Sequence, residues 1–421
     1  MLHALIKATL TTALALVPTL SAAQSVTLDV TYSSGSYTEI MEETAARFAA
    51  AHPGVTIDLR APYERHEAHL QATLRDAALG TPADVAFHGN HLVRIVVERG
   101  IAQPIDDFVG EAGFEALGYD PAVPGVARYD GQTFGLPWQI SVPIIFYNAD
   151  LVARAGGDPA NLPTDWDGVL DLAEAINGLG DHITGGHFAY DTNGNCTFQS
   201  LINSHGGTMM NDGETELTFT GADGVWALGV MRDFAERGGM IDMSGNQAQQ
   251  LFEGGNLGIL ASFSSLLGRF ERAAAGNFDL VTGRWPIPAA DGTVPAGGRT
   301  IVIQTEEDAK QQAAWDYLTF MTGPEVQSLL VERIGGVPAN SRVIESGDYL
   351  AQYYAERPAA RTGTKMIPRL SGWYAFPGEN PVRIVDTIKE GLRQVITLEA
   401  EPDAVAAALA GKVTPMLGTA R

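Results

Sequence analysis

The sequence predicts an α/β protein made of two lobes, and three observations predict this class. Short apolar strands alternate with amphipathic helices over the N-terminal part of the chain, as in mainly parallel sheets covered by helices. The chain has 421 residues, 45% hydrophobic and 18% charged, which is enough for two domains with full cores. Near 134–138 two short strands come close together, and we interpret this change as a crossing into a second lobe.

The opening segment shows the alternation most clearly. Residues 26–32 alternate apolar and polar side chains and run into a turn of small residues, which predicts a strand. Apolar residues at helical spacing over 40–49 predict a helix, and the following 52–54, His-Pro-Gly, predicts its end. The same patterns predict a strand over 55–59, a helix over 63–79, a strand over 83–87 and a helix over 91–99.

The second lobe is predicted from strands and helices separated by glycine-rich turns. Residues 148–150 cap a helix that follows a strand over 143–147, and 164–166 open another helix. The remaining predictions are helices over 195–203, 221–238 and 264–275, strands over 257–262 and 297–303, and C-terminal helices over 313–321, 324–333, 382–397 and 402–416.

Residues 1–23 have the features of a secretory signal peptide. Lys7 supplies a positive charge, 8–20 are almost entirely apolar or uncharged, and 21–23 fit the small-residue cleavage rule, so we expect cleavage after Ala23. No later stretch reaches 18 consecutive apolar residues. The expected location of the mature protein is therefore the periplasm.

Charge and motifs exclude several classes of function. With 50 acidic and 27 basic residues the formal charge is −23, which argues against a nucleic-acid partner. The single cysteine, Cys196, excludes an intramolecular disulfide and a cysteine-based zinc cluster. Neither a serine-hydrolase elbow nor a nucleotide phosphate loop occurs, and we expect no cofactor. A glycoside hydrolase needs only two carboxylates, so this alternative stays open.

Four histidines occur as two pairs with a spacing of three. His66 and His69 fall on one predicted helix, and His88 and His91 follow the next strand, so that each pair could face one metal ion. Neither pair has a third ligand at a characteristic spacing. We expect exposed polar histidines and no metal site.

An ordered set of motifs resembles the extracellular solute-binding proteins of ABC importers, of the large carbohydrate-binding type. The motifs that carry the resemblance span the mature chain and lie at 45–48, 52–55, 80–85, 135–137, 146–151, 163–167, 252–256, 297–298, 313–321 and 335–339. The spacing around Tyr63, the glycine pair at 297–298 and the C-terminal helices looks most like the glycerol-3-phosphate-binding branch.

The resemblance implies a two-lobe periplasmic binding protein fold of type II, with a hinge and an interlobe cleft that closes on one solute. The expected N-terminal lobe comprises 24–138 and 298–340, and the C-terminal lobe 139–297 and 341–421. The implied protein is not an enzyme. It is expected to be a monomer that delivers a sugar, a polyol or a glycerol-3-phosphate-like solute to the transmembrane subunits of an ABC permease.

Ligand-binding residues are expected at strand ends and turns, where clefts of open α/β sheets form. Polyhydroxylated solutes need flat apolar faces for stacking and short polar groups for their hydroxyls. Residues of these types at such positions are Ser34, Ser36, Tyr63, Gln139, Ser141, Tyr190, Asn193, Ser264, Trp373 and Tyr374.

Two arginines bear on the charge of the ligand. Arg299 follows Gly298, where backbone can approach a ligand closely, and Arg383 opens a C-terminal helix. A guanidinium group suits the oxygens of phosphate, whereas a surface salt bridge is the alternative for each arginine. The acidic residue that the glycerol-3-phosphate branch carries in its first turn falls on Ser34. A neutral polyol, a sugar and another organophosphate therefore remain alternatives.

Overall fold

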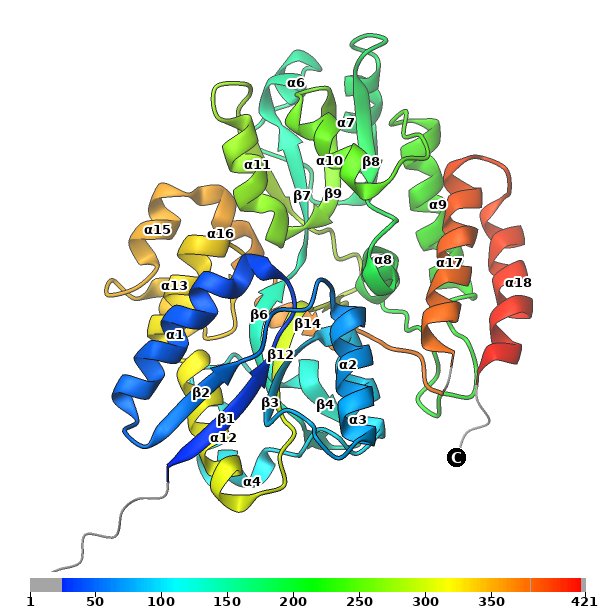
Figure 1. Cartoon of the computed structure of the whole chain (residues 1–421). Coiled ribbons are helices and arrows are strands. Elements are labelled where there is room, and N and C mark those ends of the chain that lie inside the picture. Colours follow the sequence, from blue (N-terminus) through cyan, green and yellow to red (C-terminus); the bar gives the residue numbers. More distant parts are fainter. Residues whose placement is uncertain (1–24, 379, 418–421) are drawn as a thin grey trace, which may run out of the picture.

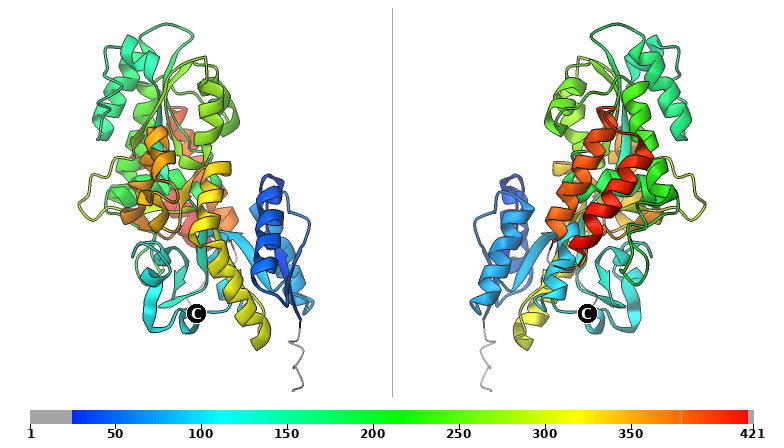
Figure 2. Two further views of the ribbon diagram at one scale, coloured as in Figure 1. Left: turned by 90° about the vertical axis from the view of Figure 1, so that its left-hand side faces the viewer. Right: turned by 90° about the vertical axis from the view of Figure 1, so that its right-hand side faces the viewer.

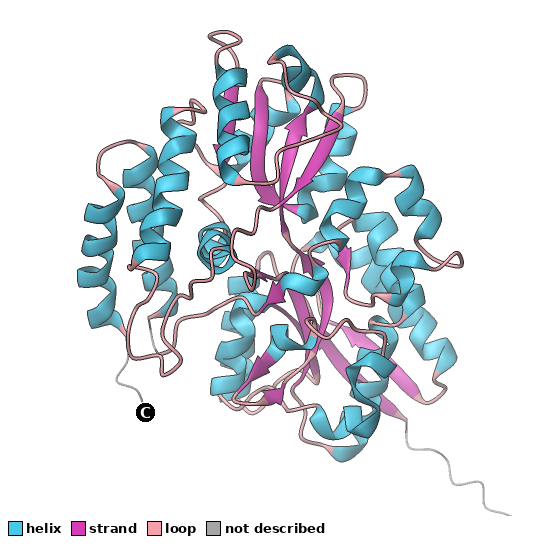
Figure 3. Cartoon of the chain, turned by 180° about the vertical axis from the view of Figure 1, so that it is seen from behind, coloured by secondary structure: helices cyan, strands magenta, loops and turns pink. Residues whose placement is uncertain are grey.

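The computed structural model describes residues 25–378 and 380–417, so the predicted signal peptide lies outside the described residues. It shows two β-sheets, each covered by helices and joined at the middle of the molecule (Figure 1). Figure 3 shows the two sheets one above the other, with strands passing between them. None of the helices in 25–378 and 380–417 combines the length and apolar character that a membrane span requires.

The N-terminal sheet has six strands in the order β13-β6-β12-β3-β1-β2. β1 pairs with β2 and β3 in parallel, and β12 runs antiparallel to both β3 and β6. The parallel part is the βα alternation that the sequence predicts. The strands of this sheet are β1 (Val26–Thr31), β2 (Val55–Leu59), β3 (Val85–Gly89), β6 (Leu136–Ser141), β12 (Gly297–Ile303) and β13 (Val337–Pro338).

Helices cover both faces of this sheet, because successive residues of a strand point to opposite faces. Val85 and Phe87 of β3 join the main core, together with Phe48, whereas Ala86 packs with Val93 in a separate cluster. The helices concerned are α1 (Thr38–Ala51) and α12 (Asp308–Met321) on one side, and α2 (His66–Ala78) and α3 (Val93–Glu98) on the other.

The C-terminal sheet has four strands in the order β10-β7-β9-β8, in which β7 is antiparallel to β9 and β10, and β8 is parallel to β9. Its strands are β7 (Pro143–Asn148), β8 (Thr184–Phe188), β9 (Leu257–Phe263) and β10 (Leu280–Arg284). Its helices are α6 (Ala149–Arg154), α7 (Trp166–Asn177), α8 (Cys196–Ser204), α9 (Ala222–Glu236), α10 (Gly245–Glu253) and α11 (Leu267–Ala274).

The chain passes between the sheets in the middle of a nearly continuous strand. β6 runs through Val142 directly into β7, so the change of sheet lies beyond the boundary that we expected after Trp138. Gln139 and Ser141 thus belong to the N-terminal sheet. The chain returns at Gly297 with β12, and α12 and α13 (Pro324–Ile334) precede β13. After β13 it crosses again through α14 (Arg342–Glu345), α15 (Ala351–Glu356) and α16 (Pro358–Thr364).

The last two helices cover the side of the C-terminal lobe. α17 (Pro381–Ile396) and α18 (Pro402–Val413) pack on each other and on α9, as Figures 1 and 2 show. The short elements that remain are α4 (Asp106–Val109), α5 (Gly113–Ala116), β4 (Arg128–Tyr129), β5 (Gln132–Thr133), β11 (Val294–Pro295) and β14 (Leu370–Ser371).

Two predicted helices begin later than expected. The predicted helix over 63–79 begins at His66, because Tyr63 instead forms a parallel bridge with Ser33. The predicted helix over 91–99 is a 3₁₀ turn (Asn90–Leu92) followed by α3. Both differences place backbone turns, rather than helix, at the ends of β1 and β3.

Candidate functional site

The ends of β1, β3 and β6 and the start of β12 meet at the edge of the N-terminal sheet that faces the C-terminal lobe. Arg299 of β12 lies between Gly89, the last residue of β3, and Gln139 of β6, and it pairs with both. Ligands of open α/β sheets bind at this edge, outside the carboxyl ends of the parallel strands. Arg299 is thus placed by strand register where a ligand is expected.

The Arg299 side chain is buried, with 8% of its surface exposed. Its Nη1 donates to the Tyr37 hydroxyl (2.8 Å) and to Oε1 of Gln139 (2.7 Å). The guanidinium carbon lies 4.0 Å from the centre of the Tyr37 ring, a cation–π contact. Its Nε is buried and has no hydrogen-bond partner among the described residues. Burial lowers the pKa of Arg299, but an arginine in a protein stays protonated.

No carboxylate balances this buried charge among residues 25–378 and 380–417, where no Asp or Glu oxygen lies within 4.0 Å of the Arg299 nitrogens. Arg60 shows the contrast, because it pairs with Asp29 and with Asp76 (2.7 Å). A buried charge is costly unless it is paired. The site therefore has the electrostatic character of a place that an anion would complete.

Four histidines of α2, of the end of β3 and of the turn after it lie close to one another, and we call them the histidine cluster: His66, His69, His88 and His91. The ring of His69 stacks between those of Tyr63 (5.1 Å between centroids) and His88 (4.6 Å), and the rings of His66 and His91 lie 5.7 Å apart. His69, His88 and His91 are buried, so the expectation of exposed polar histidines is wrong for them. Packing of α2 on β3 buries them. Within the described ranges no three side chains converge in a way that could hold a metal ion.

Burial disfavours the charged form of His66, His69 and His88. It lowers the pKa of His66 to about 2 and that of His69 to about 4, and the positive charge of Arg299 adds to both effects. Burial also lowers the pKa of the fully enclosed His88 well below the usual value. Arg299 thus lies near His66 and His69, whose imidazoles carry no charge at neutral pH.

Acid is expected to destabilise the fold, because buried histidine rings that stay neutral in the folded chain become protonated in the unfolded chain. The folded pKa of His69 and of His187, a buried residue of β8, is about 4, whereas the unfolded value is near 6.5. Below pH 6.5 the unfolded chain binds protons that the folded chain does not, so stability falls as pH falls towards 4. Each ring should lower the free energy of unfolding by about 2 kcal/mol between pH 6.5 and pH 5.

Urea denaturation at pH 7 and pH 5 measures this loss. His187→Leu should reduce it by about 2 kcal/mol, because the titrating ring is gone. His182→Leu, a change at an exposed position, serves as the control and should leave the loss unchanged. Equal losses in all three proteins would contradict the prediction.

Two aromatic residues of the C-terminal lobe reach the same edge. Trp373 packs on His91, with 4.3 Å between the ring centroids, and its indole N–H points to the carbonyl oxygen of Gly194 (3.4 Å). Tyr374 donates from its hydroxyl to Glu214 (3.0 Å). These two residues form an aromatic wall that is in direct contact with the histidine cluster through Trp373 and His91.

An arginine of the N-terminal lobe holds the same loop. Arg94 of α3 pairs with Glu214 and donates from Nη1 to the carbonyl oxygen of Ala375 (3.1 Å). Glu214 follows α8 in the chain and belongs to the C-terminal lobe. The two lobes are thus joined by an ion pair beside the aromatic wall.

Several of the predicted residues are engaged elsewhere. Ser141 and Ser264 bind backbone N–H groups at the change of sheet, those of Ser265 (3.3 Å) and Val142 (3.1 Å). The Tyr190 hydroxyl donates to Asp242. The two serines thus stabilise the passage from β6 to β7, and Tyr190 stabilises the segment after β8. All three side chains are hydrogen-bonded within the protein.

The remaining predicted residues lie near the edge but more exposed. Ser34 and Ser36 form a hydrogen bond with each other (2.7 Å) in the turn after β1. Asn193 is exposed in the turn before α8. Tyr63 is half-buried against His69, and Gly298 directly precedes Arg299 in β12.

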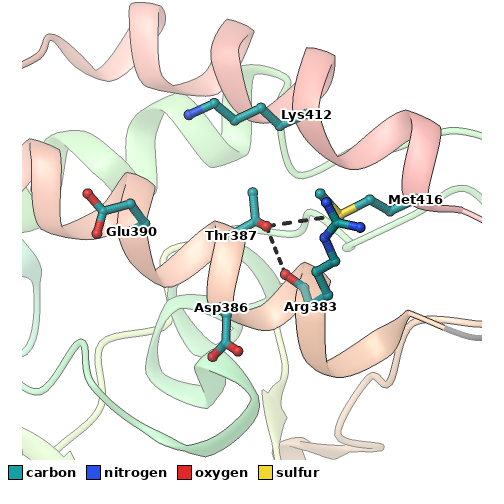
Figure 4. A pocket seen from close by; sticks show the side chains of 6 residues that line it. All are labelled: Arg383, Asp386, Thr387, Glu390, Lys412 and Met416. Carbon is teal, nitrogen blue, oxygen red and sulfur yellow. Dashed lines mark hydrogen bonds between the residues drawn. The ribbon is translucent and has the colours of Figure 1, made fainter.

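The structure places Arg383 away from this group. It is exposed on α17 and lines a depression of about 430 Å³ between α17 and α18 (Figure 4). The other lining residues are Asp386, Thr387, Glu390, Lys412 and Met416. Helix spacing alone did not reveal which side of α17 the arginine occupies.

Comparison with known proteins shows the family. A family model described as bacterial extracellular solute-binding protein matches residues 43–360. The chain belongs to this family. Its members bind solutes and are not enzymes, which decides against the carbohydrate-cleaving alternative.

This solute-binding protein has relatives with named ligands. It is 27% identical over 333 residues to the sn-glycerol-3-phosphate-binding periplasmic protein UgpB of Agrobacterium fabrum, covering 74% of this chain and 71% of that protein. The sugar-binding protein MalE from Xanthomonas citri is similar in structure with a TM-score of 0.80 and 21% identity, covering 93% and 97% of the two chains. UgpB from Mycobacterium tuberculosis, in complex with glycerophosphocholine, is similar in structure with a TM-score of 0.77 and 17% identity. The match covers 92% of this chain and 97% of that protein. These likenesses confirm the predicted two-lobe fold.

Trp373→Ala is expected to weaken solute binding by this protein by about 1–3 kcal/mol, because the indole packs directly on His91 at the cleft edge. Trp226→Ala removes an indole from α9 and is the matched control. Calorimetry with the solute that binds best measures both, and unchanged affinity in Trp373→Ala would make this wall purely structural.

Proposed function

We propose that this protein is the periplasmic receptor of an ABC importer and that its solute carries a phosphate on a small polyol, as glycerol 3-phosphate does. The observation that supports the anionic solute is the buried guanidinium of Arg299, which has no carboxylate partner among the described residues. A buried cation without a counter-charge is costly for the folded protein, so in a solute-binding protein we expect such a cation at the cleft edge to contact the solute.

The geometry of Arg299 suits a phosphate group. One nitrogen, Nη1, is used by Tyr37 and Gln139, which fix the plane of the guanidinium. The buried Nε has no partner in the part of the chain that the structure describes, so the fork keeps donors for an incoming oxygen. A guanidinium with a fixed plane loses little freedom when it binds two oxygens of one phosphate.

The neighbouring groups suit the polyol part of such a solute. Ser34 and Ser36 lie exposed or half-exposed at the end of β1, and hydroxyl groups there can both donate and accept. Trp373 supplies an apolar face. The UgpB relative of Agrobacterium fabrum is named for binding sn-glycerol 3-phosphate, which is in accord with this choice.

The cellular role that we propose follows from the family and the sequence. The features of 1–23 predict export to the periplasm, and the solute would be passed to the transmembrane subunits of an ABC permease by a monomeric receptor. Closure of the two lobes would occur where β6 passes into β7 and where β12 returns.

A binding screen tests the proposal. We expect sn-glycerol 3-phosphate or glycerophosphocholine to raise the thermal stability of the mature chain, and glycerol and maltose to leave it unchanged. A solute at 100 times its Kd should add about 2.7 kcal/mol to the free energy of unfolding. Stabilisation by neutral sugars or polyols alone would contradict the anionic solute while leaving the receptor function in place.

A further inference from the structure

Three unpaired polar groups lie together at the end of β3. Both ring nitrogens of His91 are buried and have no hydrogen-bond partner within 25–378 and 380–417, and the same holds for Nε of Arg299. His66 is half-buried and uses Nδ1 for the Ser33 hydroxyl (3.0 Å). Its Nε2 has no partner among the described residues. Buried polar groups are normally satisfied, so a cluster of unsatisfied ones requires an explanation.

A glycine brings these groups together. A Cβ atom at Gly89 would lie 2.9 Å from both Nδ1 of His66 and Cε1 of His91, so the two rings pack directly over the backbone there. Gly89 is also the register partner of Arg299. The two imidazoles and the guanidinium are therefore arranged around one residue at the cleft edge of the sheet.

His69 and His88, the other two members of the cluster, each use Nε2 to contact a residue in or next to a strand of the sheet. Nε2 of His69 contacts the Thr31 hydroxyl (2.9 Å), and Nε2 of His88 contacts the amide of Gln304 (3.2 Å). Nδ1 of each of these two rings is also buried without a partner among the described residues. His66 and His91 differ from them in position, because their rings pack over Gly89, the register partner of Arg299.

We propose that His66 and His91 bind the anionic group of the solute together with Arg299, and that this histidine pair takes up a proton when the solute binds. The inference rests on the proposed function, because it requires an anionic solute.

The charges that face the pair explain the coupling. His66 faces Arg299 of β12, His69 of its own helix, His91 and the carboxylate of Glu67. Arg299 and His91 both repel a proton on His66, after burial the main causes of its low pKa. An anion in contact with Arg299 would offset that repulsion and attract a proton to the pair.

Glu67 assists from the other side. Its carboxylate oxygen lies 3.6 Å from Nε2 of His91, longer than a hydrogen bond, and contact with that ring is the main cause that lowers the pKa of Glu67 to about 2. Trp373, from the loop before α17, covers the remaining face of His91 and carries no charge. A proton on the pair thus has one carboxylate and the bound anion to stabilise it.

Linkage fixes the direction of the effect. If binding of the anion favours protonation, protonation must favour binding by the same factor. The affinity for an anionic solute should therefore be higher at pH 6 than at pH 8.

Proton uptake on binding is the direct test. The probes are glycerophosphocholine and inorganic sulfate, because neither titrates between pH 6 and 8 and any proton must come to the protein. In a pH-stat titration of the mature chain in unbuffered saline at pH 6, we expect uptake of about half a proton or more for each probe bound. Calorimetry should give a Kd at pH 6 about twofold or more below that at pH 8.

Variants locate the proton. The double variant His66→Gln, His91→Gln should abolish the uptake and weaken binding by roughly tenfold, as expected for loss of hydrogen bonds to a charged group. His182→Gln, an exposed change, is the control and should retain both. The uptake by the unmodified chain is itself decisive, so the test stands even if the double variant does not fold.

The outcomes separate the two proposals. Binding of a probe with constant Kd from pH 6 to 8 and no proton uptake overturns this inference and leaves the anionic solute intact. Uptake that persists in the folded double variant overturns the assignment to His66 and His91. Failure of both probes and of sn-glycerol 3-phosphate to bind, whether or not neutral solutes do, overturns the anionic solute and the inference with it.

Discussion

Arg299→Gln should weaken the binding of sn-glycerol 3-phosphate by about 2–5 kcal/mol, which is a factor of roughly thirty to several thousand in Kd. The guanidinium is buried and has no carboxylate partner among the described residues, so in the complex it would be the main positive charge in contact with the phosphate. Glutamine keeps a polar side chain of similar length but leaves that anion unpaired in a closed cleft. Calorimetry with the purified mature chain measures the change.

Two further variants make the result specific. Arg299→Lys should also bind poorly, because an ammonium group lacks the planar fork that Tyr37 and Gln139 hold in place. Arg383→Gln is the matched control, since this arginine is exposed on α17, and its affinity should stay within threefold of the unmodified protein. If Arg299→Gln also stays within threefold, the solute is neutral or its charge is bound elsewhere.

The stability of the unliganded protein provides a second readout. Burying a cation without a counter-charge costs free energy, so its removal should leave the unliganded fold about as stable as before, within about 1 kcal/mol. A large loss of stability in Arg299→Gln would instead show that the arginine serves mainly to hold Tyr37 and Gln139 in the core.

Local patterns in the sequence predict most elements of the fold. The strand over 55–59 and the strand over 297–303 have the bounds of β2 and β12. The predicted cap at Asn148 is confirmed, because its side chain accepts hydrogen bonds from the backbone N–H groups of Asp150 (3.1 Å) and Leu151 (3.2 Å). Such features depend on residues that are near one another in the chain, which is why the sequence alone reveals them.

One element that prediction missed, β8, has a composition that is atypical of a strand. β8 contains Gly185 and Gly186, and glycine is disfavoured in strands. Both are required by packing: a Cβ at Gly185 would lie 1.9 Å from the carbonyl oxygen of Ala173, and one at Gly186 would lie 2.9 Å from the Phe234 ring. For α10, the capping box of Ser244 and Gln247 was a signal that could have been used.

The histidine cluster illustrates what sequence spacing cannot predict. The spacing of three suggested that His66 pairs with His69 and His88 with His91. In the structure His69 stacks on His88 and His66 faces His91. These contacts depend on how α2 packs against β3, and no pattern within either segment contains that information.

Gly298→Ala is expected to lower the free energy of unfolding strongly, because the backbone at this position excludes a side chain. Gly298 has a φ of 113°, in the region that favours glycine, and a Cβ atom would lie 1.9 Å from the carbonyl oxygen of Gln139. That oxygen belongs to the neighbouring strand β6, so β12 and β6 would have to separate where their register shifts, between Arg299 and Thr300. We expect a loss of about 3 kcal/mol or more in the free energy of unfolding.

The same variant should also impair binding, since any shift of β12 moves Arg299 away from the hydrogen bonds that orient it. Gly229→Ala is the matched control: Gly229 lies within α9, a Cβ there meets no atom within 4 Å, and alanine should stabilise the helix by about 0.5–1 kcal/mol. Urea denaturation of the three proteins at pH 7 measures stability, and calorimetry measures affinity. A Gly298→Ala protein within 1 kcal/mol of the unmodified chain, and with unchanged affinity, would show that β12 can shift without moving the arginine. In that case the close approach of β12 to β6 would not be what positions the guanidinium at the cleft edge.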